Sequence, residues 1–238
     1  MGRKRRTPKV TWVILAAVIV IASVAVGYTY SNAYGRPSCH APISQKPIIL
    51  YINQGNGIVN SSEYPAMLKF ALCQGFNTVF FQVVYQGKLL FSPQLLKSFV
   101  QEARSANLTI FFTLYLTSDS QSIPKSILGL GEDGVSLDMS TLSTSVQQSL
   151  LATLQANFAG TTAVTTDNFG TTLKPDLLIL ETYAWPQDQS LVKPGIVASV
   201  EALATNSYSQ FESEFRYALN NSDGVMVFDY HGMMEDRY

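Results

Sequence analysis

Residues Gly75 to Tyr115 read GFNTVFFQVVYQGKLLFSPQLLKSFVQEARSANLTIFFTLY and contain two apolar runs joined by a helical pattern. The runs are NTVFFQVVY (Asn77 to Tyr85) and LTIFFTLYL (Leu108 to Leu116), the second of which continues one residue beyond the quoted stretch. Both are continuous rather than alternating, which is typical of parallel strands buried on both faces. Between them, Ser92-Pro93 predicts a helix start, because Ser caps helices and Pro fits the first helical position. The stretch therefore predicts a β-α-β unit.

Apolar runs of the same kind recur along the chain, separated by helical segments. The predicted strands are Pro47 to Asn53, Asn77 to Tyr85, Leu108 to Leu116, Gly134 to Met139, Asp176 to Trp185, Gly195 to Leu203 and Gly224 to Gly232. The segment Thr161 to Thr166 (TTAVTT) is β-prone but poorly apolar, and it is a candidate for an eighth strand. With it, the pattern predicts an α/β fold, a compact (β/α)8 TIM-like barrel. Without it, an incomplete barrel or an open doubly wound sheet is the alternative.

The charge of the chain is unevenly distributed. Charged residues make up 14% of the sequence, and the formal net charge is −1. Five of the 16 basic residues and none of the 17 acidic ones lie among the first nine positions, so the remainder has 11 basic and 17 acidic residues and a net charge of −6. This remainder lacks the basic excess that a general nucleic-acid binder needs to neutralise phosphates. We therefore expect no nucleic-acid partner.

The N-terminus has the pattern of a membrane anchor. A basic stub (residues 1–9) precedes a predicted transmembrane signal anchor (residues 10–30), whose apolar core is Val10 to Gly27. Basic flanks stay in the cytoplasm, which predicts a single-pass cell-membrane protein with its C-terminal part outside the cytoplasm. Residues 31–46 are then a linker, and residues 47–238 an extracytoplasmic barrel. A signal peptide cleaved near Ser23-Val24-Ala25 is the alternative.

Two further features agree with export. Glycosylation sequons begin at Asn60, Asn107 and Asn220, which is compatible with a glycoprotein. The chain has two cysteines, Cys39 and Cys73. In an oxidising compartment they form a candidate disulfide between the linker and the first helix, and two buried free thiols are the alternative.

The sequence has no motif for a resident cofactor or metal. Neither GxGxxG nor GxxxxGK[ST] follows the first strand, where residues 54–57 (QGNG) read as a turn. No Gly-x-Ser-x-Gly elbow of a serine hydrolase is present. The two cysteines and the two histidines, His40 and His231, do not assemble into a zinc pattern.

Carboxylates and aromatic residues occur near the predicted C-terminal ends of the strands, where barrels and open parallel sheets bind ligands. Glycoside hydrolysis requires one carboxyl that holds a proton and one that attacks or activates water. The catalytic candidates are Asp138, Glu181 and Asp229. Aromatic rings stack on sugar faces while their polar tips bind hydroxyls. The candidates for substrate binding are Tyr51, Gln82, Tyr115, Tyr183, Trp185 and His231.

Each candidate also has a purely structural interpretation. Asp138 fits a cap of the following helix, and Glu181 fits a partner of a buried base, because an unpaired carboxylate in a buried strand is costly. Asp229 fits an ordered strand end, and Gln82 a satisfied polar residue inside the barrel. Glu201 is a weaker candidate, since it fits equally on the helix after its strand.

The Gly75 to Tyr115 stretch resembles the second and third units of glycosyl-hydrolase-like TIM barrels, in particular the glycosidases of glycosyl-hydrolase-like family 10. The matching residues are Asn77, Thr78, Val79, Phe81, Gln82, Val83, Phe91 and Ser92. The segment Asp133-Gly134-Val135-Ser136-Leu137-Asp138 is similar to the fourth strand of that family and, more distantly, of family 18 chitinases. The resemblance implies a TIM barrel that acts on carbohydrate.

The chain departs from both families at the end of this strand. The chitinase pattern has a Glu two residues after the Asp, where this chain has Ser140, and Met139 replaces an acid of the family-10-like pattern. A catalytic pair would therefore combine Asp138 with Glu181 or Asp229.

Three functional hypotheses follow. The first is a membrane-anchored glycoside hydrolase-like protein that acts on a cell-surface glycan or polysaccharide. The second is a catalytically inactive carbohydrate-binding or structural surface protein on the same barrel. The third is a subunit of a membrane complex that uses the N-terminal helix as its contact. The sequence does not determine the oligomeric state.

Overall fold

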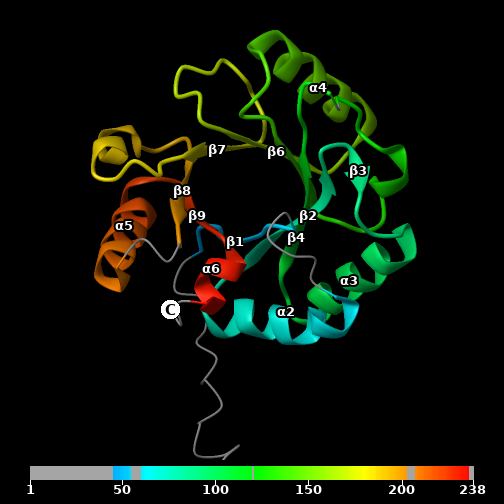
Figure 1. The fold of residues 1–238 in the computed structure, drawn as a ribbon, viewed down its shortest axis with the longest axis horizontal. Coiled ribbons are helices and arrows are strands. Elements are labelled where there is room, and N and C mark those ends of the chain that lie inside the picture. The colour runs from blue at the N-terminus through cyan, green and yellow to red at the C-terminus, as the bar shows by residue number, and fades with distance from the viewer. Residues whose placement is uncertain (1–44, 55–59, 120, 203–206, 236–238) are drawn as a thin grey trace, which may run out of the picture. The chain divides into compact units, whose positions relative to one another are not determined.

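A computed structural model describes residues 45–54, 60–119, 121–202 and 207–235 (Figure 1). The strands are β1 (Ile48–Ile52), β2 (Thr78–Tyr85), β3 (Lys88–Leu89), β4 (Thr109–Tyr115), β5 (Gly134–Asp138), β6 (Thr161–Thr166), β7 (Leu177–Glu181), β8 (Val197–Glu201) and β9 (Gly224–Phe228). All of them except β3 pair in parallel with their neighbours, and β3 pairs antiparallel with the end of β2.

The eight parallel strands close into a barrel. The order runs β1-β9-β8-β7-β6-β5-β4-β2, and β1 also pairs with β2, with Tyr51 opposite Phe80. The weakly apolar TTAVTT segment is indeed a strand, β6, and lies between β5 and β7. The TIM-like barrel is therefore confirmed, and the open doubly wound sheet is excluded.

Helices surround the ring of strands in Figure 1, but not every strand is followed by one. The α-helices are α2 (Tyr64–Cys73), α3 (Pro93–Ser105), α4 (Thr144–Asn157), α5 (Tyr208–Asn221) and α6 (Tyr230–Glu235). Among the described residues, short 3-10 turns, η2 (Lys125–Ile127) and η3 (Gln187–Leu191), replace an α-helix after β4 and β7, and β6 is followed by a loop. Pro124 and Pro186 precede the two turns, and a proline restricts helix formation by the residue before it.

The predicted helix start at Ser92 is confirmed. The Ser92 hydroxyl accepts a hydrogen bond of 3.3 Å from the Leu95 N–H, and Pro93 is the first residue of α3. Leu96, Phe99 and Val100 lie on the buried face of this helix. This cap places α3 against β2 and fixes the direction in which the chain returns to β4.

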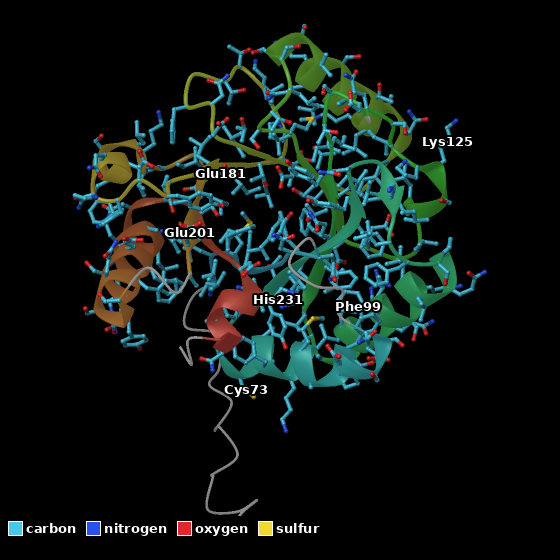
Figure 2. All side chains as sticks on the ribbon, viewed as in Figure 1. Cys73, Phe99, Lys125, Glu181, Glu201 and His231 are labelled. Carbon is cyan, nitrogen blue, oxygen red and sulfur yellow. The ribbon has the colours of Figure 1, made fainter. Side chains whose placement is uncertain are left out.

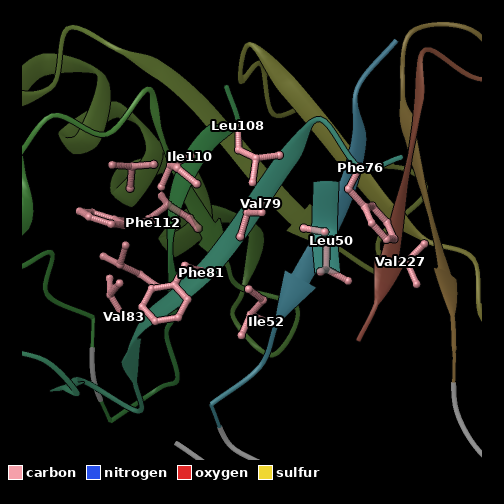
Figure 3. Packing of buried hydrophobic residues seen from close by; sticks show 14 of the residues in the cluster. Leu50, Ile52, Phe76, Val79, Phe81, Val83, Leu108, Ile110, Phe112 and Val227 are labelled. Carbon is pink, nitrogen blue, oxygen red and sulfur yellow. The ribbon is translucent and has the colours of Figure 1, made fainter. Parts of the chain in front are cut away.

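The outer face of the barrel carries the larger hydrophobic core. Strand residues such as Leu50, Val79, Phe81 and Phe112 point outward in Figure 3 and pack beneath the helices. Phe81 stacks on Phe99 of α3 with ring centroids 4.2 Å apart. Burial of this surface, at about 25 cal/mol per Å², is the main term that holds the helices on the barrel.

A smaller core fills the inside of the barrel. Its fully buried members are Ile49, Tyr51, Phe80, Phe111, Ala163, Ile179, Val197 and Met226. The rings of Phe80 and Phe111 stack with centroids 4.6 Å apart. Phe111 lies directly over Gly134, where an added Cβ would meet the ring at 2.1 Å. Glycine at 134 thus lets a phenylalanine close the lower part of the barrel.

The predicted membrane anchor lies outside the described residues, as do the basic stub and nearly all of the linker. Within the described part of the chain, no helix has the length and apolarity needed to cross a bilayer. The anchor stays a prediction.

Candidate active site

Four carboxylates come from neighbouring strands at one end of the barrel. Asp138 ends β5, Asp167 follows β6, Glu181 ends β7 and Glu201 ends β8. Alternate residues of a strand share a face, so Glu181 and Glu201 point the same way as the interior residues Ile179 and Val197. Figure 2 shows Glu181 and Glu201 near each other on the ring. This end is the C-terminal mouth, where TIM barrels carry their active sites.

Asp138 is the most buried of the four, with 8% of its surface exposed. Its Oδ2 accepts a hydrogen bond of 3.3 Å from the Tyr51 hydroxyl. Burial raises the pKa of Asp138 to about 7, and the negative charge of Glu181 adds to the rise. The Tyr51 hydrogen bond and the Ser140 backbone offset part of it, because they favour the ionised form.

Glu181, the last residue of β7, is half-buried. Burial raises its pKa to about 7, and the charges of Asp167 and Glu201 raise it further. The pKa of Glu201 is raised as well, first by burial and then by Glu214 and Asp229. The mouth therefore holds two carboxyls, Asp138 and Glu181, that change protonation state near neutral pH.

A chain of hydrogen bonds leads to Asp138 from the end of β1. The Gln54 N–H donates to Gln82 Oε1 at 2.7 Å, and Gln82 Nε2 donates to the Tyr51 hydroxyl at 3.3 Å. Tyr51 and Gln82 are 1% and 2% exposed, and their roles in substrate binding stay predictions. The structure places these two predicted substrate binders behind Asp138, where they orient its carboxyl. The satisfied-polar interpretation of Gln82 is thus the one the geometry favours.

Other tyrosines surround the mouth. Tyr115 ends β4 and stacks on Tyr85 of β2 with centroids 5.4 Å apart and planes 19° from parallel. Both are partly exposed. The Tyr183 hydroxyl lies 3.0 Å from Ser199 Oγ of β8, and burial raises its pKa, as does the charge of Glu181. Tyr115 and Tyr183 thus lie within the electrostatic reach of the acid pair.

Three further predicted site residues have structural contacts away from this pair. Asp229 is fully buried at the start of α6, where its Oδ1 accepts a hydrogen bond of 2.9 Å from the Gly232 N–H. Trp185 packs edge-on against Tyr217 of α5, with centroids 5.3 Å apart, on the outer side of the strands. His231 lies on α6, and its ring meets Tyr230 with centroids 5.5 Å apart. Their functional roles stay predictions.

Asp167 is the site residue that the sequence analysis missed. It directly follows β6, the strand with the weakest apolar signal, and its charge raises the pKa of both Asp138 and Glu181. The sequence could have indicated Asp167, because it directly follows a candidate strand and the other acids of the mouth also lie at strand ends.

Two remaining expectations concern metals and cysteines. Among the described residues, no group of three or more His, Cys, Asp or Glu side chains is arranged to hold a metal ion. Cys73 is buried at the end of α2. Cys39 lies outside the described residues, and its pairing with Cys73 stays a prediction.

Comparisons with known proteins bear on the fold. The chain matches no protein-family model, and it matches no curated protein by sequence. Solved structures match over most of its length. A xylanase-alpha-amylase inhibitor protein, solved in complex with trehalose, superposes with a TM-score of 0.54 at 11% identity, over 82% of this chain and 96% of that one.

Two other solved structures also match the fold of this chain. The GH113 beta-mannanase of Alicyclobacillus acidocaldarius has a TM-score of 0.52 at 9% identity and covers 80% of this chain and 88% of that one. An uncharacterized B. cereus protein has a TM-score of 0.52 at 11% identity, over 78% of this chain and 61% of that one. At these identities the likeness shows the fold alone. The chain is a TIM barrel, and the resemblance to glycosyl-hydrolase-like barrels of families 10 and 18 stays a prediction.

Proposed function

We propose that this protein is a glycoside hydrolase that acts on a cell-surface glycan or polysaccharide. One observation carries the proposal: Asp138 and Glu181 share the mouth of a TIM barrel, and the pKa of each is raised to about 7. Hydrolysis of a glycosidic bond needs one protonated and one ionised carboxyl at the same pH. Two interacting carboxyls that titrate near neutrality supply that combination, since loss of the first proton hinders loss of the second.

The environments of the two groups suggest their roles. Glu181 is the more accessible, and its raised pKa suits a general acid that donates a proton to the leaving oxygen. The Tyr51 hydrogen bond favours the ionised form of Asp138, which then stabilises positive charge that develops at the anomeric carbon. Burial, and after it the charges of Asp167 and Glu201, keep the pKa of Glu181 high. Asp229 accepts a hydrogen bond from the Gly232 N–H at the start of α6, and we assign it no chemical step.

The rim offers a surface for sugar rings. Tyr115 and Tyr85 present a stacked aromatic pair beside the acids, and aromatic faces bind the apolar faces of sugars. The carboxylates make the mouth a poor site for uronic acids or phosphorylated polymers, because like charges repel. We therefore propose a neutral or amino-sugar glycan as substrate.

The proposed location is the outer side of the cell membrane. It follows from the apolar segment of residues 10–30 and the basic residues before it. An anchored barrel would meet polymeric substrates at the cell surface.

The test compares acid variants of the full-length chain on a panel of neutral and amino-sugar polysaccharides. Release of reducing ends is measured for wild type, Glu181→Gln and Asp138→Asn. We expect each variant to lose about 10²- to 10⁴-fold in rate, the usual contribution of a general acid or base. The matched control is Glu212→Gln, which alters a half-exposed carboxyl paired with Arg216 on α5. Full activity in both acid variants would refute the assignment.

A second function is favoured by a specific observation. The inhibitor protein that superposes on this chain was solved with trehalose, and it is matched over nearly its whole length. An inactive barrel that binds carbohydrate is therefore the alternative. It predicts saturable glycan binding by the wild-type chain with no release of reducing ends from any bound sugar.

A further inference from the structure

Within the part of the chain that the structure describes, three hydroxyls inside the barrel have no hydrogen-bond partner. Thr113 of β4, Ser136 of β5 and Thr165 of β6 are 0%, 0% and 1% exposed, and the Oγ atom of each is unpaired. Asp138 Oδ1 is also buried without a partner at hydrogen-bonding geometry, although Oδ2 of the same carboxyl binds Tyr51. Four unpaired polar atoms thus occur on three successive strands.

The strand register brings these atoms to one part of the barrel wall. Thr113 lies directly opposite Ser136, and Asp138 lies directly opposite Thr165. Ser136 and Asp138 are two residues apart on β5, so both face the interior. The hydroxyls of Thr113 and Ser136 therefore lie just beneath the carboxyl of Asp138, and the hydroxyl of Thr165 lies beside it at the same level.

An apolar layer closes this region from below. Gly134, two residues before Ser136, is covered by the ring of Phe111, which stacks on Phe80. Across the barrel, Ser199 of β8 is also fully buried, but its hydroxyl is paired with Tyr183 at 3.0 Å. Among the described residues, the buried serine and threonine hydroxyls without a partner thus all lie on the β4–β6 side.

Such a cluster is costly if it stays dry. A buried hydroxyl without a partner has lost its hydration and lowers the stability of the fold. Native proteins avoid this cost by holding buried water, which typically makes about three hydrogen bonds to otherwise unsatisfied polar groups. Three hydroxyls and a carboxyl oxygen on adjacent strands supply four partners, which is enough for one such water.

We propose that the barrel contains a buried hydration site, in which ordered water bridges Thr113, Ser136 and Thr165 to Asp138 Oδ1. Water that donates to Oδ1 favours the ionised carboxylate and connects it to the interior of the barrel. The proposal rests on the proposed function only for its catalytic consequence, since the site itself requires no substrate.

The direct test counts long-lived internal water. Magnetic relaxation dispersion of water ¹⁷O detects molecules held inside a protein, and it is measured on the full-length chain. We expect a triple variant, Thr113→Val, Ser136→Ala and Thr165→Val, to hold fewer long-lived waters than wild type. An unchanged number would overturn the proposal. If the triple variant does not fold, the single variants are measured in the same way.

Thermal unfolding gives a second test, because a hydrated cluster and a dry cluster predict Tm changes of opposite sign. A hydrated site predicts that Thr113→Val and Thr165→Val each lower the Tm by about 2–4 °C. A dry site predicts an equal or higher Tm, because valine has nearly the same shape without the unpaired hydroxyl. Thr182→Val calibrates the scale, since its buried hydroxyl donates directly to the Ser199 carbonyl at 2.8 Å. Where the two readings differ, the water count decides.

Neither measurement involves glycan hydrolysis. If the triple variant holds fewer waters than wild type but wild type cleaves no glycan, the hydration site is supported and the proposed function is refuted. If the water count is unchanged in the triple variant but Glu181→Gln loses hydrolysis, the hydration site is refuted and the proposed function is supported.

Discussion

The Tyr51 hydroxyl donates a hydrogen bond of 3.3 Å to Asp138 Oδ2 across the inside of the barrel, from β1 to β5. These residues are 87 positions apart in the sequence and meet only because the barrel closes. Gln82 holds the tyrosine in turn, so that a backbone N–H of the β1 end is linked to a carboxyl on the far strand. The orientation of the candidate acid thus depends on the closed ring.

Removal of this hydrogen bond should raise the pKa of Asp138. The bond favours the charged carboxylate, and its loss in Tyr51→Phe leaves burial and Glu181 as the dominant influences. We expect the ¹³C NMR titration of the Asp138 carboxyl to move to higher pH. Tyr64→Phe is the control, because that buried tyrosine lies in the outer core against Phe81. A titration that moves equally in both variants, or in neither, would show that Tyr51 does not orient Asp138.

The raised pKa of Glu181 predicts how stability changes with pH. Its pKa is about 7 in the folded chain and about 4.5 in the unfolded chain, so the folded form binds the proton more tightly. The stabilisation is complete below pH ~4.5 and is lost as the pH rises through ~7. At pH 8, Glu181→Gln should therefore raise the free energy of unfolding by about 1–3 kcal/mol, a range reduced for partial exposure.

Urea unfolding at pH 4 and pH 8 measures this effect. Glu212→Gln, on the outer face of α5, should change the free energy of unfolding by less than about 0.5 kcal/mol at either pH. A Glu181→Gln variant that is no more stable than wild type at pH 8 would mean that the carboxyl is not destabilised by its surroundings.

Gly134 should not tolerate a side chain. A Cβ at this position would lie 2.1 Å from the ring of Phe111, which itself stacks on Phe80. We expect Gly134→Ala to destabilise the protein by about 1–3 kcal/mol, as overpacking of a core does. Gly170→Ala is the matched control, because the nearest atom to its Cβ is 3.5 Å away and the residue is exposed. Equal unfolding midpoints for the two variants would contradict the packing described.

Gln82 should be needed for stability as well as for orientation. Gln82→Leu removes the acceptor of the Gln54 N–H and the donor to Tyr51 inside the barrel. We expect a loss of about 1–3 kcal/mol in the free energy of unfolding, the cost of polar groups left buried without that partner. Gln148→Leu, on the exposed surface of α4, should change stability by less than about 0.5 kcal/mol. Equal unfolding curves for the two would argue against the chain of hydrogen bonds.

Local patterns were enough to predict the barrel strands, because buried parallel strands carry continuous apolar runs. The β-prone threonines of β6 made it a candidate eighth strand despite its weak apolar signal, and the structure confirms that strand. The helices were predicted less fully, since prolines and short connections replace them after β4 and β7. Asp138 and Glu181 were found because they end strands, which is a local property.

The remaining features of the site depend on closure. The strand register makes Tyr51 and Gln82 face inward behind Asp138. The end of β9 determines that Asp229 caps α6. The unpaired hydroxyls of Thr113, Ser136 and Thr165 become a cluster only when three strands align. A linear sequence shows three ordinary polar residues in strands and gives no signal that they meet.

The most direct test of the account is hydrolysis of neutral and amino-sugar polysaccharides by the full-length chain, with Glu181→Gln, Asp138→Asn and Glu212→Gln measured side by side. Wild type and Glu212→Gln should release reducing ends, while Glu181→Gln and Asp138→Asn should be slower by about 10²-fold or more. Equal rates in all four proteins, or no release from any glycan that the wild-type chain binds, would contradict it.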